Sequence, residues 1–225
     1  MANGSSTVRS TSSPLRLIFS RLLSFIFGTP SSEEAAAPIK STKPNTVSVI
    51  SAAIVAKKVV KNDFMYRGII LLGTNLGDKY GNLELARKEL QEHLDIPRAS
   101  TIYQTPPWGY ESSEDYFNQA LEFTTILGPD EVMNLCLATE KSMGRVRSGS
   151  GYADRPIDID ILAIDGVTSN TALLEVPHPR LHLRKFALMP LVELWPDWRH
   201  PHMNLTAREL LNQCPDSVDP VVISQ

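Results

Sequence analysis

Apolar residues recur at regular spacings through most of the chain. A wholly apolar run at 69–72 ends in the turn-forming sequence at 73–78, which predicts a buried strand followed by the start of a helix. Over 83–94, apolar residues return every three or four positions, so we expect a helix with one apolar stripe. Asp78 is its expected N-cap, and the helix should end before Pro97.

The middle of the chain continues with the same kinds of signal. A brief strand at 102–103 runs into a loop at 105–109, where two prolines exclude both a helix and a central strand. Alternating apolar and polar positions over 117–127 predict a strand with a buried face. A helix should follow over 129–144, because proline suits its first turn and glycine its end.

The last third begins with a basic, glycine-rich stretch at 145–156 that has no periodicity and is expected to be a mobile loop. Isoleucine and aspartate then alternate at 157–161, which is the clearest strand pattern in the chain. A hairpin is expected at 165–166, and two short helices at 186–194 and 206–213.

The resulting order is strand, helix, strand, strand, helix, strand. This order predicts an α+β fold of the ferredoxin-like kind, an open sheet with two helices packed on one side. We therefore expect residues 65–225 to form one folded domain.

Residues 1–64 are a separate, low-complexity basic leader, rich in Ser, Thr, Ala and Pro. Their apolar stretch at 15–27 is too short and too often interrupted to span a bilayer. Its helical spacing allows an amphipathic helix of the transit-peptide type, whereas the composition equally suits a disordered, dispensable extension. Both interpretations remain open.

Composition and charge indicate the class of protein and argue against some functions. Hydrophobic residues make up 42% of the chain and charged residues 21%, as in ordinary globular proteins. The leader holds 8 Lys and Arg against 3 Asp and Glu, whereas residues 65–225 hold 14 against 22, and so acidic a domain argues against nucleic-acid binding. Only two cysteines are present, which favours a reducing compartment. We expect a cytoplasmic protein, or an organellar one if the leader is a transit peptide.

Asp158 and Asp160 are the first candidates for chemistry. Two positions apart on a strand, their side chains leave the same face about 6.5–7 Å apart. At an effective dielectric constant of about 20, their mutual repulsion is about 2–2.5 kcal/mol when both are ionised. A hard divalent cation such as Mg²⁺, shared with a nucleotide, would relieve it. Taken alone, the same pattern also describes a strand with one solvated face.

Three arginines, Arg145, Arg147 and Arg155, lie on the glycine-rich stretch just before these aspartates. Guanidinium groups beside a carboxylate pair suit phosphoryl transfer, because charge on the transferring group must be neutralised. The alternative is a solvated basic turn.

Taken together, several segments of the chain resemble the 6-hydroxymethyl-7,8-dihydropterin pyrophosphokinase family, whose members transfer a pyrophosphoryl group from ATP to a pterin alcohol in folate biosynthesis. The matching segments occur in the family's order: GTNLGD at 73–78, YQTPPWG at 103–109, DYFNQA at 115–120, GRVR at 144–147, RPIDIDIL at 155–162 and VPHPRLHLRKFAL at 176–188.

The resemblance implies an ATP-dependent diphosphokinase in which Asp158 and Asp160 hold two Mg²⁺ ions. Arg145 and Arg155 would act on the phosphates of the co-substrate ATP. Other nucleotide contacts are implied for Glu140, Arg147, His178 and Arg184. Contacts with a reduced hydroxymethylpterin are implied for Thr105, Pro106, Trp108, Tyr116, Asn118 and Phe186, with Tyr116 and Phe186 stacking on its two faces. We expect a monomer with no nucleic-acid partner and no stable membrane span.

The chain also departs from the commonest family pattern. Many relatives have Gly-Pro where this chain has Ala153 and Asp154, and threonine where it has Pro156. Asp154 adds a negative charge near the phosphate path. Lys185 replaces a residue that is often small, which affects the expected shape around Phe186.

Two other functions fit parts of the pattern. A Mg²⁺-dependent phosphohydrolase could use the same acidic strand without any pterin. A ferredoxin-like binding module without catalytic activity could have kept the fold alone.

Overall fold

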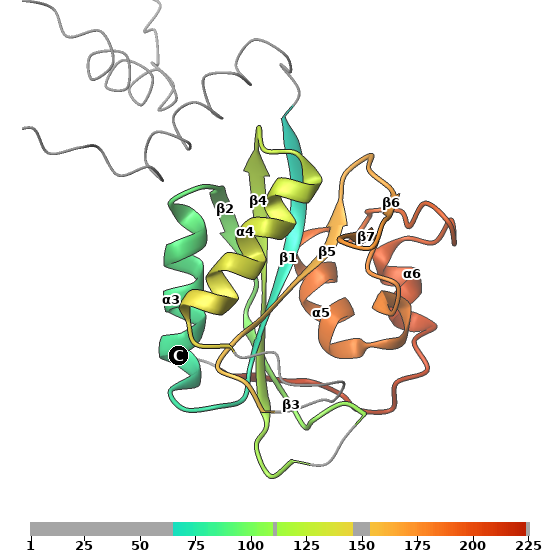
Figure 1. Cartoon of the computed structure of the whole chain (residues 1–225). Helices are drawn as coiled ribbons and strands as arrows, with labels where there is room; N and C mark the ends of the chain where they lie inside the picture. The colour runs from blue at the N-terminus through green and yellow to red at the C-terminus, as the bar shows by residue number, and fades with distance from the viewer. Residues whose placement is uncertain (1–64, 110–111, 146–153, 224–225) are drawn as a thin grey trace, which may run out of the picture. The chain divides into compact units, whose positions relative to one another are not determined.

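A six-stranded antiparallel sheet forms the centre of the fold in the computed structural model, which describes residues 65–109, 112–145 and 154–223 (Figure 1). Neighbouring strands follow the order β5-β1-β4-β3-β8, and β2 also pairs with β4. The strands are β1 (Tyr66–Thr74), β2 (Asp95–Ala99), β3 (Ile102–Thr105), β4 (Tyr116–Thr125), β5 (Asp158–Ile164) and β8 (Val221–Ile223).

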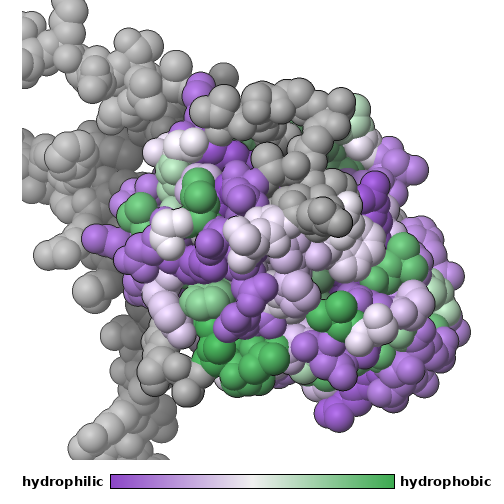
Figure 2. Space-filling view, turned by 90° about the horizontal axis from the view of Figure 1, so that it is seen from below, coloured by the Kyte–Doolittle hydropathy of each residue, from purple (hydrophilic) through white to green (hydrophobic). Residues whose placement is uncertain are grey.

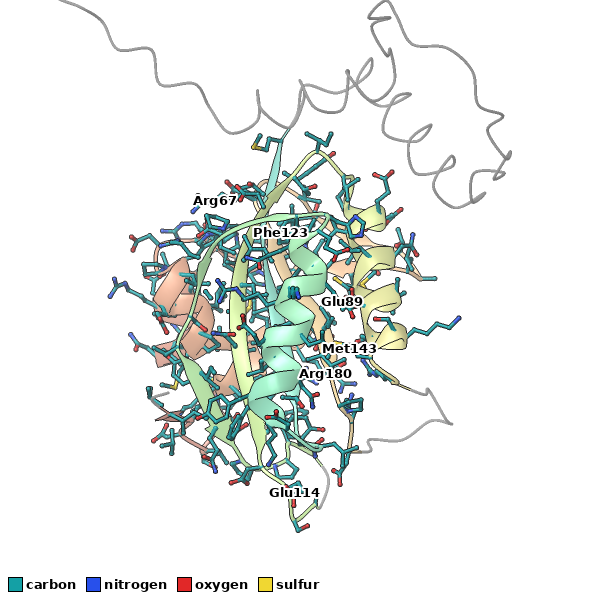
Figure 3. The ribbon with its side chains drawn as sticks, turned by 90° about the vertical axis from the view of Figure 1, so that its left-hand side faces the viewer. Arg67, Glu89, Glu114, Phe123, Met143 and Arg180 are labelled. Carbon is teal, nitrogen blue, oxygen red and sulfur yellow. The ribbon has the colours of Figure 1, made fainter. Side chains whose placement is uncertain are left out.

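Strand β1 is apolar throughout its centre because both of its faces are buried. Ile70 and Leu72 pack with α3 (Lys79–Gln91) and α4 (Pro129–Ser142) in one core cluster. Ile69 and Leu71 pack on the opposite face of the sheet, in a second cluster. That cluster is formed with α5 (Lys185–Leu194) and α6 (Ala207–Asn212). Figure 3 shows the two pairs of helices on opposite sides of the sheet.

The ferredoxin-like arrangement expected from the element order is confirmed. The two helices that were expected on one side of the sheet are α3 and α4, which contact each other and the strands beside them. The pattern also predicted α5 and α6, but only the structure shows that α5 covers the second face, against β3 and β4. The sheet therefore has helices on both sides.

The local signals for helix ends are confirmed as well. Asp78 is the N-cap of α3, and its carboxylate accepts a hydrogen bond from the backbone N–H of Gly81 at 3.0 Å. Pro129 stands in the first turn of α4. A capping box formed by Thr206 and Glu209 begins α6.

Several short elements escaped the sequence patterns. Strand β2 contains Pro97, which the strand tolerates because β2 pairs with β4 alone among the described strands and so lies at an edge. Strand β8 and three short elements around 169–183 have no periodic pattern that predicted them. These are β6 (Ser169–Asn170), β7 (Glu175–Val176) and the 3-10 helix η1 (Leu181–Leu183).

Strand β5 extends beyond its predicted end. Ile69 pairs with Ala163 and Ile70 with Ile161, so Leu162 is an extra residue in a β-bulge. The leader, residues 1–64, and most of the predicted mobile loop, including Arg147, lie outside the described residues. Within the described ranges, no helix is both long enough and apolar enough to cross a membrane.

Candidate active site

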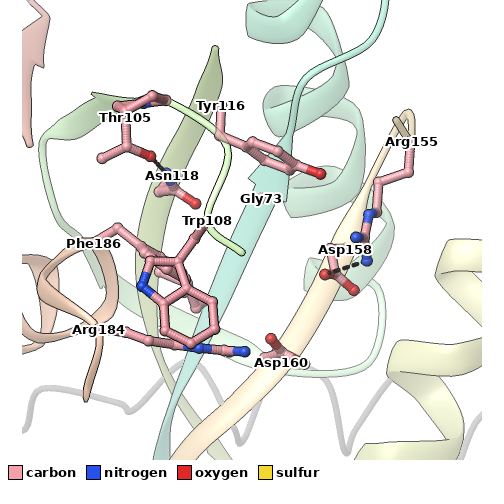
Figure 4. Close-up of a pocket in the computed structure, with 12 residues that line it drawn as sticks. Gly73, Thr105, Trp108, Tyr116, Asn118, Arg155, Asp158, Asp160, Arg184 and Phe186 are labelled. Atoms are coloured by element: carbon pink, nitrogen blue, oxygen red, sulfur yellow. Dashed lines mark hydrogen bonds and ion pairs between the residues drawn. The ribbon is translucent and has the colours of Figure 1, made fainter. Parts of the chain in front are cut away.

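A pocket opens where β1 ends and where β4 and β5 begin (Figure 4). Strand register creates it, because Gly73 near the end of β1 pairs with Asn118 on one side and with Asp158 on the other. The lining includes every residue expected to contact the pterin, as well as Arg155, Asp158, Asp160 and Arg184. Segments spread over more than one hundred residues of sequence therefore meet at one site.

Gly73 lines the pocket and was not predicted as a site residue. A Cβ atom at this position would lie 3.3 Å from Oδ1 of Asn118 and 3.8 Å from Cβ of Asp158. Because Gly73 has no side chain, space remains between Asn118 on β4 and Asp158 on β5. The sequence signal was a glycine in a turn-forming motif, which indicates a turn but not its neighbours across the sheet.

The side of the pocket formed by β3 and β4 combines aromatic rings with one fixed amide. Asn118 is buried, and its Nδ2 donates to Oγ1 of Thr105 at 3.0 Å. The rings of Tyr116, Trp108 and Phe186 surround this amide (Figure 4). Seen from below, the molecule has small groups of hydrophobic residues among hydrophilic ones (Figure 2). The wall of the pocket, with aromatic rings around one amide, suits a flat ligand ring with polar edges.

The β5 side of the pocket carries the two predicted carboxylates. Asp158 binds the guanidinium groups of both Arg145 and Arg155, the latter with Nη1 2.8 Å from Oδ2. Burial and the nearby charge of Asp158 raise the pKa of Asp160 to about 7, although Arg184 acts in the opposite direction. Arg145 and Arg155 are thus close to the acids, as expected, and both contact Asp158.

The carboxylate pair fits a magnesium ion better than a metal held by protein alone. Within the described ranges, no group of three or more His, Cys, Asp or Glu side chains could hold a metal ion. Mg²⁺ commonly uses one or two protein carboxylates and completes its octahedron with water and substrate phosphates. Asp158 and Asp160 supply that number of ligands, and a cation would relieve the repulsion that raises the pKa of Asp160.

Glu140 supports the β5 side of the site through two hydrogen bonds. Its buried carboxylate accepts a hydrogen bond from the backbone N–H of Ile159 at 2.9 Å and another from Arg145. These bonds hold Arg145 beside the start of β5. The contact with ATP that the resemblance implies for Glu140 stays a prediction, since Glu140 and Arg145 are not among the residues that line the pocket.

Arg184 brings a buried positive charge to the pocket. Its guanidinium carbon lies 4.8 Å from the ring centre of Trp108 and 5.5 Å from that of Phe186. Its buried Nε atom has no hydrogen-bond partner among the described residues. A buried donor without a partner is costly, so a ligand oxygen would satisfy it.

His178 lies near Arg184 as a neutral donor rather than a cation. Burial and the charges of Arg184 and Arg180 lower the pKa of His178 to about 4. Its Nδ1 accepts a hydrogen bond from the backbone N–H of Arg180 at 3.1 Å, which places the proton of the neutral ring on Nε2.

Asn75, also absent from the predicted site, ties the loop before β5 to the end of β1. Its Oδ1 accepts from the backbone N–H of Arg155 at 2.9 Å, and its Nδ2 donates to Oδ1 of Asp154 at 2.6 Å. The structure thereby shows where the unusual Asp154 carboxylate lies. The motif at 73–78 contained Asn75, but only the folded chain reveals these contacts.

Fold and site together define an α+β protein whose pocket joins an aromatic cleft to paired carboxylates and arginines, as in enzymes of phosphoryl transfer. Residues 69–196 match the family model described as 7,8-dihydro-6-hydroxymethylpterin-pyrophosphokinase (HPPK). The chain belongs to this family, which confirms the resemblance found in the sequence.

Two curated relatives are named as pyrophosphokinases. The chain is 38% identical over 130 residues to the 2-amino-4-hydroxy-6-hydroxymethyldihydropteridine pyrophosphokinase of Aquifex aeolicus, covering 58% of this chain and 81% of that protein. It is 37% identical over 134 residues to the enzyme of the same name from Porphyromonas gingivalis, covering 58% and 90%.

Solved structures agree on the fold. An HPPK-DHPS crystallised with substrates matches with a TM-score of 0.53 at 15% identity, over 65% of this chain and 43% of that one. A Plasmodium falciparum HPPK-DHPS matches with a TM-score of 0.56 at 17% identity, over 70% and 46%. The chain thus spans less than half the length of these two proteins, and the likeness concerns the fold alone.

Proposed function

We propose that the chain transfers the pyrophosphoryl group of ATP to 6-hydroxymethyl-7,8-dihydropterin, giving AMP and the pterin diphosphate in folate biosynthesis. The observation that carries this proposal is the joining, in one pocket, of an aromatic cleft with a fixed amide and a carboxylate pair beside arginines. The aromatic cleft with its amide suits a flat bicyclic alcohol, and the carboxylate pair beside arginines suits a triphosphate.

In this proposal, the pterin ring lies between Tyr116 and Phe186, where stacking on both faces favours a flat heterocycle. Asn118 is the polar contact, because its bond to Thr105 leaves its carbonyl oxygen to accept from the N–H groups of the ring. Pro106 and Trp108 wall the same cleft.

Asp158 and Asp160 would hold Mg²⁺, with two ions expected from the family resemblance. When bound, magnesium neutralises phosphate charge and increases the acidity of the substrate hydroxyl. Two guanidinium groups balance the charge of Asp158 in the structure, and magnesium would take over that role when the arginines contact the phosphates.

When ATP binds, Arg145 and Arg155 would leave Asp158 and contact the phosphates of ATP. Arg147, Arg184 and His178 would contact the same phosphates. The hydroxymethyl oxygen attacks the β-phosphorus and loses its proton to solvent, the bond from the β-phosphorus to the oxygen of the α-phosphate breaks, and AMP leaves. No covalent intermediate with the protein is needed, so these side chains contribute by positioning the groups and neutralising their charge.

The decisive experiment mixes the protein with ATP, MgCl₂ and reduced hydroxymethylpterin and measures AMP. AMP that forms only when the pterin is present supports the transfer. A phosphohydrolase would instead release phosphate or pyrophosphate without the pterin. A binding module without catalytic activity would consume no ATP.

We also propose a monomer of the cytoplasm, with an organellar location as the alternative if residues 1–64 act as a transit peptide. Light scattering on the purified chain tests the first statement. N-terminal sequencing of the mature protein tests whether the leader is removed.

A further inference from the structure

The segment that follows α6 contacts the pocket elements from two sides, although it lies beyond the family match at 69–196. Its strand β8 pairs with β3, so that Val221 is opposite Gln104. Strand β3 ends at Thr105, which lines the pocket together with the next residue, Pro106. The same segment also reaches the first turn of α5, through Asp216.

Helix α5 begins without a cap of its own. The residue at its N-cap position is Arg184, whose side chain makes no capping hydrogen bond and lies in the pocket instead. The first backbone N–H groups of a helix have no partner within the helix, so the beginning of α5 needs an acceptor from elsewhere.

Asp216 supplies that acceptor from thirty-one residues along the chain. Its Oδ2 accepts from the backbone N–H of Lys185 at 3.2 Å, while its Oδ1 accepts from the backbone N–H of Val218 at 3.1 Å. Both carboxylate oxygens are therefore held. A negative charge at a helix N-terminus is also favourable to the helix dipole.

The capped residue stands between two residues that line the pocket, Arg184 and Phe186. Lys185 makes a second contact with the same segment, from Nζ to Oδ1 of Asp219 at 2.6 Å. Asp219 is mostly exposed, so this ion pair contributes little. The unusual lysine nevertheless points to the same conclusion: the C-terminal segment holds the first turn of α5.

We propose that Asp216 is a positioning residue for the pterin side of the pocket. By capping α5 it keeps the ring of Phe186 in place, although it touches no substrate itself. The identity of the ligand rests on the proposed function. The cap is a property of the fold and can be tested separately.

The test compares Asp216→Ala with Asp216→Asn, because asparagine keeps a side-chain oxygen that can accept the same hydrogen bond. We expect Asp216→Ala to raise the KM for hydroxymethyldihydropterin about fivefold and to leave kcat within about twofold of wild type. Asp216→Asn should restore the wild-type KM. The matched control is Thr206→Ala, which removes the N-cap of α6, a helix that contributes none of the pocket-lining residues.

An unchanged KM in Asp216→Ala, or an equal rise in Thr206→Ala, would overturn the positioning role. Amide hydrogen exchange gives a readout that needs no turnover: the N–H groups of Lys185 and Phe186 should exchange faster in Asp216→Ala than in wild type. Unchanged exchange would also reject the proposal. If wild type made no AMP but these amides exchanged faster in the variant, the proposed function would fail while the cap remained.

Discussion

Asp158 makes more of the described polar contacts in the pocket than Asp160, since it accepts from both Arg145 and Arg155. Asp160 lies one pleat further along β5, opposite Leu71 of β1, and its raised pKa shows that its environment opposes a second negative charge. The two carboxylates therefore have different neighbours, and replacing each should have different consequences for stability.

Asp160→Asn should lower kcat by at least about 10²-fold, because the variant loses a charged ligand for the proposed magnesium ion. Thermal unfolding should occur at the same temperature or higher, since the substitution removes a negative charge that burial and Asp158 disfavour. Initial rates of AMP formation at several MgCl₂ concentrations measure the effect. Near-normal magnesium-dependent activity would contradict the metal assignment.

Arg155→Ala should lower kcat about 10²-fold while weakening pterin binding much less, because a phosphate contact stabilises the transferring group rather than the ring. The exposed Arg208 on α6 gives a control, Arg208→Ala, that removes the same charge elsewhere. Steady-state kinetics with each substrate varied in turn separate kcat from KM. An unchanged kcat would exclude a phosphate role for Arg155.

A second charged cluster joins several elements at the other end of the sheet. The carboxylate of Glu122 on β4 binds Arg67 of β1 and Arg98 of β2, each at 2.5 Å. Arg98 also donates to the backbone carbonyl of Leu194 at the end of α5. Figure 3 places Arg67 at the opposite end of the structure from Glu114, which precedes β4. We assign this cluster to stability.

Glu122→Gln should lower the free energy of unfolding by about 1–3 kcal/mol at pH 7, because two arginines lose a charged partner. Burial alone would raise the pKa of Glu122, but hydrogen bonds from Arg67 and Arg98 outweigh it and lower the pKa. A lowered pKa stabilises the fold above the ordinary value of 4.5, and this contribution is lost as the pH falls through the folded-state value.

Urea unfolding of wild type and Glu122→Gln at several pH values tests this assignment. The difference between the two proteins should be largest near neutrality and should shrink in acid. A difference that stays constant from pH 7 to about pH 3 would mean that the charge of Glu122 is not its cause.

Two core clusters are formed among the described residues. Strand β1 begins at Tyr66, and both clusters are formed by residues from there onward. We therefore expect a protein that begins at Met65 to fold and to keep its activity.

Calorimetry and AMP assays on this shortened protein, beside the full chain, test that expectation. The unfolding temperature should agree within about 2 °C, since the core is unchanged. kcat should be the same for both proteins. A shortened protein that unfolds earlier would show that residues 1–64 contribute to the domain.

Hydrophobic spacing correctly predicted most elements that are long or strongly periodic, from the two-sided strand β1 to the capped helix α3. It failed for β2 and β8, because a short edge strand buries little on either face and β2 contains Pro97. The motif at 155–162 likewise predicted the acidic pair, since alternation alone puts Asp158 and Asp160 on one face.

Other parts of the site depend on contacts between distant segments. Gly73 became a pocket residue through strand register, Asn75 through its bonds to the loop before β5, and Asp216 by capping a helix that begins thirty-one residues earlier. Local spacing and residue chemistry are properties of neighbouring positions, so the sequence alone determined the long, periodic elements and the acid pair. Register and long-range hydrogen bonds arise only when segments pack together, so the tertiary structure alone decided the parts that no local motif could carry, which are the places of Gly73, Asn75 and Asp216.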